Sequence, residues 1–357
     1  MTLQAEIETL RGAAGLTRLD HVAGLRIEGK DAFAILDLLS TRPLFLREGQ
    51  IGHSLFLRED AGLFADAFVC FGEDAFYVLC EGPSQSELLA YVQAERARRL
   101  PGADASVEGL SEGFELLGVN GPYAWEVVAE LLGPSVLGMP YLTLMHVEAG
   151  LCLRAGKTGE YGYDLLVRRQ EAAALGARLR EVGEPLGLRE VSLAALDQCG
   201  LENWHFSMRT LRETRFAVPL TPFELQLQWR VGYDREFVGA AALRARRVQP
   251  GAMRATSFRA AAEVAAGDLV RLGQDTVGEL LAAGYSCTRG EWVGMALLPR
   301  ALAHPRIAVL AVARADRLVP IETMAPPLIN NLSLHVDPHR HSYRTREKER
   351  FPELVVG

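Results

Sequence analysis

The sequence predicts an α+β protein that is divided into two or three domains. The chain has 357 residues, whereas about 100–200 residues is usual for one domain. Strand-like and helical segments come in blocks, which is typical of α+β folds rather than of folds with alternating strands and helices. From about residue 252 to residue 336, short β-type runs separated by turn residues dominate, which predicts a separate all-β domain.

The N-terminal block predicts two helices around one strand, followed by a small α+β layer. The clearest helix signal is Ser84, because Glu87 lies three residues later and completes a capping box. Pro101-Gly102 ends that helix. The expected elements, in order, are a helix at 2–12, a strand at 24–28, a helix at 30–39, strands at 52–57, 63–71 and 75–80, and the helix at 84–99.

The middle block predicts a second mixed unit. Ala172, Leu175, Leu179 and Val182 recur at spacings of three and four, which marks an amphipathic helix that Gly183 brings to an end. The other expected elements are strands at 116–119, 146–154 and 162–168 and helices at 122–132 and 191–204. The polar and charged residues from 338 onward are expected to form an extended arm or a frayed end.

The composition excludes several functional classes. The formal net charge is -7 and the charges are scattered, which argues against a nucleic-acid partner. The five cysteines are widely spaced without a CxxC pair, so we expect thiols of a reducing compartment rather than disulfides or a zinc site. We expect no secretory leader and no membrane partner, because no run approaches the ~20 apolar residues of a membrane span. The sequence thus predicts a cytoplasmic enzyme.

The stretch at 156–164, Gly-Lys-Thr-Gly-Glu-Tyr-Gly-Tyr-Asp, is the most informative part of the chain. Its glycines allow tight turns and a close approach of the backbone to a ligand. They do not have the Walker-type spacing of a phosphate loop, and Lys157 is expected to be solvated. Further along, a buried carboxylate such as Glu202 can accept hydrogen bonds from a flat heterocycle. Glu202 and His205 have an ExxH spacing, but without a second such motif we expect no metal site.

These motifs resemble the T-protein (aminomethyltransferase) superfamily of the glycine cleavage system, which includes folate-dependent demethylases. The most specific segments are TGExGY at 158–163 and DREFVG at 234–239. Supporting segments that cover nearly the whole chain lie at 19–20, 29–32, 61–66, 119–122, 195–202 and 221–229. The resemblance implies a three-domain cloverleaf around a central folate pocket, a C-terminal β-barrel-like domain, and tetrahydrofolate as cofactor.

The predicted domain organisation follows from this resemblance. A discontinuous folate-binding domain is expected at 1–48 plus 114–248, and an inserted α+β domain at 49–113. The C-terminal β domain is expected at 249–337 and the tail at 338–357.

The resemblance also assigns the site residues. Glu202 matches the family's pterin-binding glutamate, where one carboxylate accepts from adjacent N–H groups of the ring. Tyr163 and Glu160 of the glycine stretch and Trp229 are expected to contact the cofactor as well. The alternative for Glu202 is an ion pair with an arginine on the surface, and Trp229 can equally be part of the core or of a pocket wall.

The catalytic residues are expected to be Asp66 and His53. The aminomethyltransferases carry two adjacent acids in this strand, and the first is replaced here by Ala65. Asp66 remains as the candidate to move a proton at the reacting end of the folate. His53 replaces a tyrosine that commonly contacts the pterin. An Asp that bonds only within its own turn is the alternative for Asp66.

The altered acid pair favours a tetrahydrofolate-dependent methyltransferase or demethylase. Its expected partner is a small-molecule methyl donor with an O-, S- or N-methyl group, and the methyl group moves to folate N5. Such a displacement needs the two reactants held in line. One alternative is an aminomethyltransferase of the glycine cleavage type, and another is a non-catalytic folate-binding or assembly protein. A homo-oligomer is possible, although nothing in the sequence pattern requires one.

Overall fold

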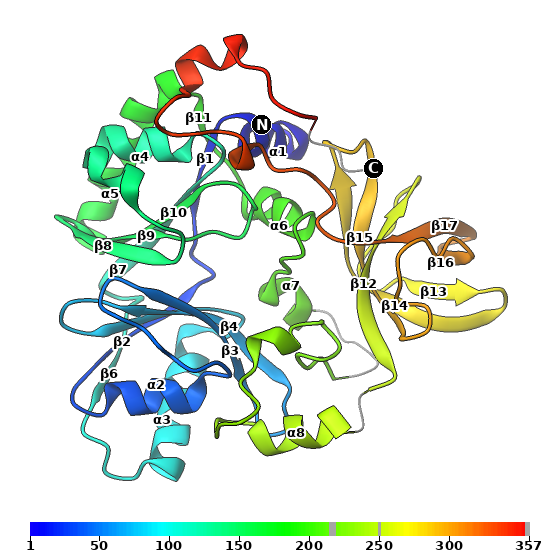
Figure 1. The fold of residues 1–357 in the computed structure, drawn as a ribbon, viewed down its shortest axis with the longest axis horizontal. Helices are drawn as coiled ribbons and strands as arrows, with labels where there is room; N and C mark the ends of the chain where they lie inside the picture. Colours follow the sequence, from blue (N-terminus) through cyan, green and yellow to red (C-terminus); the bar gives the residue numbers. More distant parts are fainter. Residues whose placement is uncertain (214–218, 249–250, 354–357) are drawn as a thin grey trace.

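The computed structural model describes residues 1–213, 219–248 and 251–353, and it arranges them in three lobes (Figure 1). Two lobes are each built on an open sheet, and the third is a closed β-barrel. In Figure 1 the two open sheets lie on the left, one above the other, and the barrel lies on the right. The predicted class, an α+β cloverleaf with a C-terminal barrel, is confirmed.

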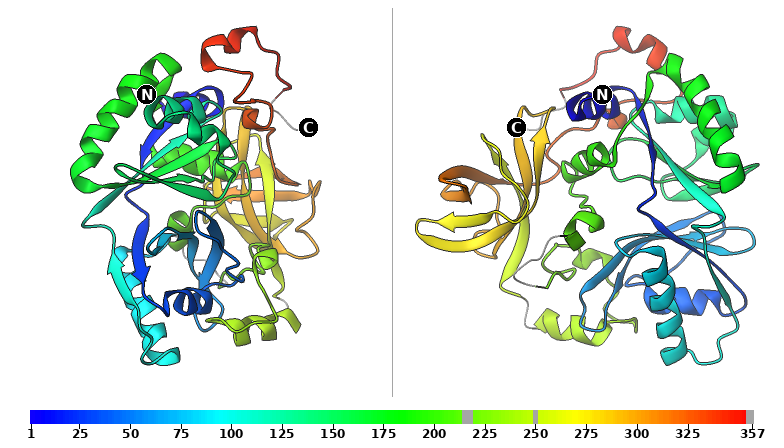
Figure 2. Two further views of the ribbon diagram at one scale, coloured as in Figure 1. Left: turned by 60° about the vertical axis from the view of Figure 1, so that its left-hand side comes forward. Right: turned by 180° about the vertical axis from the view of Figure 1, so that it is seen from behind.

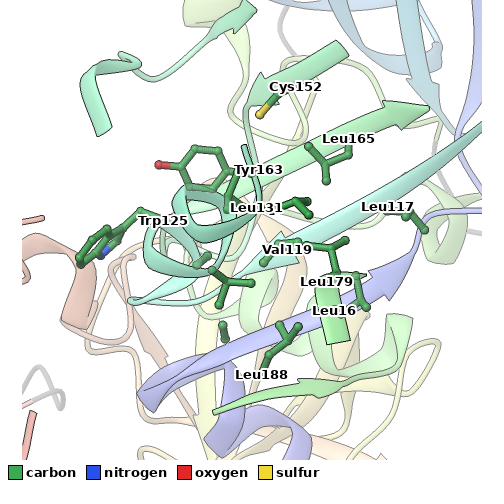
Figure 3. Close-up of a cluster of buried hydrophobic side chains, with 14 of the residues drawn as sticks. Leu16, Leu117, Val119, Trp125, Leu131, Cys152, Tyr163, Leu165, Leu179 and Leu188 are labelled. Atoms are coloured by element: carbon green, nitrogen blue, oxygen red, sulfur yellow. The ribbon is translucent and has the colours of Figure 1, made fainter. Parts of the chain in front are cut away.

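The first sheet forms the upper lobe and has the strand order β11-β1-β7-β10-β9-β8. Helices α4 and α5 cover one face of this sheet. Figure 3 shows the apolar side chains that pack between the sheet and these helices. The expected strand at 146–154 is a hairpin of two strands with its turn before Gly150. The elements are β1 (Ala14–Arg18), β7 (Phe114–Asn120), α4 (Ala124–Leu132), β8 (Thr143–Val147), β9 (Gly150–Arg154), β10 (Gly162–Arg168), α5 (Arg169–Gly183) and β11 (Leu188–Glu190).

The second sheet forms the lower lobe and has the order β3-β4-β5-β2-β6. The sequence placed residues 1–48 in the first domain, but β2 and α2 lie in this lobe because β2 pairs with β5 and β6. The capping box at Ser84 is present at the start of α3. The elements are β2 (Ala23–Glu28), α2 (Ala32–Leu39), β3 (Ile51–Leu57), β4 (Leu63–Phe71), β5 (Phe76–Glu81), α3 (Gln85–Arg99) and β6 (Ser106–Gly109).

Two helices pack together between the lobes. Helix α1 (Leu3–Gly12) lies against α6 (Leu193–Leu201), and their contact includes Leu10 and Cys199. Figure 2 shows α6 near the centre of the molecule, between the first sheet and the barrel. Helix α6 starts at the N-cap Ser192 and ends at residue 201, three residues earlier than the sequence predicted. Helices α7 (Met208–Glu213) and α8 (Ala240–Val248) follow.

The barrel closes because β12 pairs with both β15 and β17. Its strands are β12 (Met253–Ala260), β13 (Leu269–Leu272), β14 (Asp275–Ser286), β15 (Glu291–Pro299), β16 (Leu310–Arg314) and β17 (Arg317–Met324). No helix in the described part of the chain has the length and apolar character needed to cross a membrane.

The described part of the C-terminal tail packs on the first lobe rather than fraying. Glu126 of α4 accepts hydrogen bonds from the Ser342 hydroxyl at 2.6 Å and from the Tyr343 backbone N–H at 2.7 Å. The Tyr343 ring meets Tyr123 edge-on, with ring centres 5.6 Å apart. The polar composition of the tail concealed these anchors.

Candidate functional site

A cavity of about 750 Å³, including the space open to solvent, lies between the two open sheets and α6. Its wall is formed by β4 and β5 of the second sheet, by β7 and β10 of the first, and by the glycine loop before β10. Leu19, Phe68, Leu79, Leu116 and Phe206 make much of this wall apolar. A cavity with apolar walls and few polar groups is the usual form of a small-molecule site.

Asp164 and Asn120 supply the polar groups on the first-sheet side of the cavity. Asp164 on β10 pairs with Gly118, and Asn120 on β7 pairs with Gly162, so both side chains lie on one face of the sheet as diagonal neighbours. The glycines keep this face open, because a Cβ atom at Gly162 would lie 2.8 Å from Asn120 Oδ1.

Neither side chain has its acceptors satisfied. Asp164 lines the cavity, and within residues 1–213, 219–248 and 251–353 no hydrogen bond is among the interactions that shift the pKa of its carboxyl. Asn120 Oδ1 is buried without a partner. Only 6% of Asp164 is exposed. Burial raises the pKa of Asp164 to about 7, with Lys157 opposing. A carboxyl that is buried without partners is costly, and such groups are concentrated at functional sites.

Asp66 on β4 lies on the opposite side of the cavity and is held by three partners. Its Oδ1 lies 2.8 Å from both His53 Nε2 and Arg230 Nη2, and its Oδ2 lies 2.9 Å from Lys157 Nζ. Burial alone would favour the neutral acid, but His53, Lys157 and Arg230 together hold the pKa of Asp66 well below its usual range. Asp66 is therefore an anion that orients its neighbours, and it is a weak proton acceptor.

Lys157 is not solvated, which corrects the expectation from sequence. It is 17% exposed and bridges Asp66 to Glu81, whose Oε1 also lies 2.9 Å from Nζ. Burial lowers the pKa of Lys157, but the two carboxylates outweigh it and raise that pKa above its ordinary value. Burial likewise opposes ionisation of Glu81, yet Lys157 and His21 lower the pKa of Glu81 to about 2. The ammonium and both carboxylates are thus charged at neutral pH.

His53 and Ala65 lie beside Asp66 but do not line the cavity. His53 on β3 pairs with Phe68 of β4, so its side chain lies on the same face of the sheet as Asp66. Burial lowers the pKa of His53, so the imidazole is neutral at pH 7. Ala65 belongs to the apolar cluster of the second lobe, with Leu36 and Phe56. Because side chains alternate along a strand, position 65 faces this core while Asp66 faces the cavity. The replacement of an acid by Ala65 therefore does not change the cavity wall.

Glu202 and Glu160 are held by Arg11 of α1 rather than facing the cavity. Arg11 Nη2 lies 2.5 Å from Glu202 Oε2, and Arg11 Nη1 lies 3.2 Å from Glu160 Oε1. Glu160 also accepts hydrogen bonds from the backbone N–H and hydroxyl of Ser333. These contacts tie α1, the glycine loop, α6 and the tail together. Arg11 engages only Oε2 of Glu202, and Glu202 Oε1 is buried without a hydrogen-bond partner. The assignment of both acids as folate ligands stays a prediction.

Tyr163 and Trp229 also lie outside the cavity wall. Tyr163 is buried in the core of the first lobe (Figure 3). Because side chains alternate along a strand, it lies on the face of β10 opposite to Asp164. Trp229 is 67% exposed, and its neighbour Arg230 is the residue that reaches Asp66. Their contact with a cofactor likewise stays a prediction.

The cavity residues that the sequence left unassigned are Asp164, Asn120, Glu81, Lys157, Asp197 and His205. A signal for Asp164 was available, since alternation along β10 puts it on the face opposite to Tyr163. Asp197 faces the cavity from α6, where burial raises its pKa, and it pairs with Arg209.

Comparison with known proteins agrees with this architecture. The family model described as "GCVT N-terminal domain" matches residues 1–235. An aminomethyltransferase from Saccharopolyspora erythraea is 28% identical, over 90% of this chain and 89% of its own length. One from Streptomyces coelicolor is 29% identical, over 89% of this chain and 87% of its own length. The glycine cleavage system aminomethyltransferase T of Bartonella henselae has a similar structure, with a TM-score of 0.79 and 21% identity, covering 91% of this chain and 89% of that chain.

The family match and the aminomethyltransferase relatives indicate a folate-dependent enzyme. The chain belongs to the GCVT family, which confirms the resemblance that its motifs indicated. Tetrahydrofolate is the one-carbon carrier of this family, as the sequence predicted. The chemistry of the cavity wall suits such a molecule, because Asn120 Oδ1 is an unused acceptor, Asp164 lies on the same wall, and the apolar residues suit a flat ring.

Proposed function

We propose that this protein transfers an aminomethyl-type one-carbon unit to tetrahydrofolate bound in the central cavity. The relatives at 28% and 29% identity are both aminomethyltransferases, and their sequences align along most of this chain. The observation that carries the proposal is the unpartnered carboxyl of Asp164 on the cavity wall.

In this proposal Asp164 binds the pyrimidine edge of the pterin. The ring presents an amine and a ring N–H side by side, and one carboxylate can accept from both. Asn120 Oδ1 lies on the same face of the sheet and offers a third acceptor. Bound in this way, tetrahydrofolate supplies a nucleophilic nitrogen that accepts the one-carbon unit.

The remaining side chains set the charge at the other side of the cavity. Asp66 stays ionised and, with Glu81, keeps the Lys157 ammonium in place. His53 contacts Asp66 Oδ1 as a neutral imidazole. The apolar walls exclude water, which strengthens interactions between these charges and a ligand.

A second candidate is transfer of a methyl group from a methylated small molecule to folate N5. The observation that favours it is Asp66, whose two oxygens are both engaged by cationic or imidazole partners. An acid held in this way is poorly suited to take a proton from an amine, and Ala65 stands where the aminomethyltransferases carry their first acid, so this chain departs from their pattern at both positions.

One experiment separates these functions. The protein is incubated anaerobically with tetrahydrofolate and either a carrier protein that bears an aminomethyl-lipoyl group or a panel of O-, S- and N-methylated metabolites. Formation of methylenetetrahydrofolate with ammonia supports the first function, and formation of methyltetrahydrofolate supports the second. If tetrahydrofolate binds and neither product forms, the protein is a folate-binding protein without transferase activity.

A further inference from the structure

The loop between β9 and β10 brings the ammonium group of Lys157 to the wall of the central cavity. Its Nζ atom lies 2.9 Å from Asp66 Oδ2, 2.9 Å from Glu81 Oε1 and 5.5 Å from the ring centre of Phe68. An ammonium group has three donors. The two carboxylates account for two of them, so one donor is left for a ligand in the cavity.

The other titratable groups near this ammonium are poorer donors. Asp66 and Glu81 are anions at neutral pH. His205 lies on the same wall, but burial first and Lys157 second lower its pKa to about 4, so it is neutral. His21 also lines the cavity, and its Nε2 lies 3.9 Å from Glu81 Oε1, so it faces the same carboxylate as Lys157. On the opposite side, Asp164 is the acceptor that the proposed function assigns to the folate.

A one-carbon transfer needs a group with the properties of Lys157. As the bond between carbon and the folate nitrogen forms, the bond between carbon and the leaving atom breaks, and its electron pair remains on the leaving atom. A fixed cation beside that atom stabilises the developing charge, and such pre-oriented donors are among the largest contributions to catalysis. The ammonium keeps its proton and donates a hydrogen bond to the leaving atom, and the proton released from the folate nitrogen neutralises that atom.

We propose that Lys157 contacts the leaving atom of the one-carbon donor and donates a hydrogen bond to it. The inference rests on the proposed function and adds a substrate class to it: donors whose transferred carbon is bound to an oxygen or sulfur atom that leaves as an anion. A lipoyl thioether and a methyl ether or thioether all belong to this class.

The test uses 4-nitrophenol as a mimic of the leaving group, because the phenol and the phenolate have different absorption spectra. The dye is titrated from acid to alkaline pH in the presence of excess wild-type protein or of Lys157→Met. The ammonium favours the phenolate, so the apparent pKa of the bound dye is expected to be lower in the wild type than in Lys157→Met by about one pKa unit or more. This measurement requires neither folate nor turnover.

The controls keep the result specific to the cavity. Lys157→Arg retains the charge and is expected to retain most of the wild-type effect. Lys30→Met removes an exposed lysine that pairs with Asp104, and it is expected to leave the ionisation of the dye unchanged. If Lys157→Met alone does not fold, it is combined with Glu81→Gln, which removes the carboxylate left without its ammonium.

Two outcomes overturn the inference: 4-nitrophenol does not bind the wild type, or it ionises equally in the wild type and Lys157→Met. Tetrahydrofolate binding is measured on the same samples to separate this result from a failure of the proposed function. If the wild type binds folate but does not affect the ionisation of the dye, only the role of Lys157 is contradicted. A wild type that does not bind folate contradicts the proposed function.

Discussion

Arg11 and Glu202 form a buried ion pair, with 2.5 Å between Nη2 and Oε2, and it joins α1 to the end of α6. Removing one partner of such a pair leaves the other charge buried and costs about 3–5 kcal/mol. Glu160 still lies 3.2 Å from Arg11, so Glu202→Gln is expected to cost about 3 kcal/mol, at the lower end of that range. Urea unfolding measures this change.

The matched control for Glu202→Gln is Glu190→Gln. Glu190 pairs with Arg180 at 2.6 Å, but both side chains are exposed. Exposed pairs contribute about 0–1 kcal/mol, so this variant is expected to lose less than about 1 kcal/mol. Equal losses in the two variants would show that the Arg11–Glu202 pair has no special structural role.

The unfolding free energy is expected to depend on pH through Asp164. The folded-state pKa of about 7 lies above the ordinary value of 3.8, so the folded protein keeps a proton that the unfolded chain releases. This contribution to stability is present at low pH and is lost as the pH rises through about 7. Between pH 5 and pH 8 the wild type is expected to lose about 2–3 kcal/mol more than Asp164→Asn does. Parallel pH profiles of the two proteins would contradict this account.

Asp66→Asn is expected to destabilise the protein by about 3–5 kcal/mol at pH 7, because it leaves Lys157 and Arg230 without their shared anion. The pKa of Asp66 is held well below its usual value. Its stabilising contribution is therefore present above about pH 4 and is lost only as the pH falls through the lower folded-state pKa. The difference between wild type and variant is thus expected not to shrink between pH 8 and pH 5, and protonation of His53 beside the Asp66 anion can only enlarge it. A difference that shrinks between pH 8 and pH 5 would count against this ion cluster.

Ala65→Asp tests whether restoring the family's first acid restores chemistry. Ala65 is fully buried in the apolar cluster of the second lobe. A carboxylate there has no partner, so the variant is expected to lose about 4 kcal/mol or more and to gain no transferase activity. Ala94→Asp, on the exposed surface of α3, is the control and is expected to be nearly neutral. A stable and more active Ala65→Asp would mean that position 65 faces the cavity.

The fold could be predicted better than the site, because local signals fix helices and strands but do not fix which face of a strand lines the cavity. Capping at Ser84 and the spacing of Ala172 to Val182 are local signals, and both gave helices where expected. The faces of β4 and β10 depend on what packs against them. A family motif that includes Tyr163 and Asp164 does not say which of the two faces the core.

Long-range ion pairs were the second limit. Arg11 is separated by about 190 residues from Glu202, and Asp66 by about 90 from Lys157, and no sequence pattern links these partners. When Arg11 is not known to be its partner, Glu202 is interpreted as a free acid available for a ligand. When Asp66 is not known to be its partner, Lys157 is interpreted as a surface lysine of the glycine loop.

The most direct test of the central claim is calorimetric titration of tetrahydrofolate into the wild type and into Asp164→Asn, under anaerobic conditions at pH 8. One folate is expected to bind per chain, and Asp164→Asn is expected to weaken binding at least about tenfold, since a hydrogen bond to a charged group contributes about 1.5–3 kcal/mol. Asp275→Asn, an exposed change on the barrel, is expected to bind as the wild type does. Unchanged affinity in Asp164→Asn would contradict the claim that this carboxyl holds the folate.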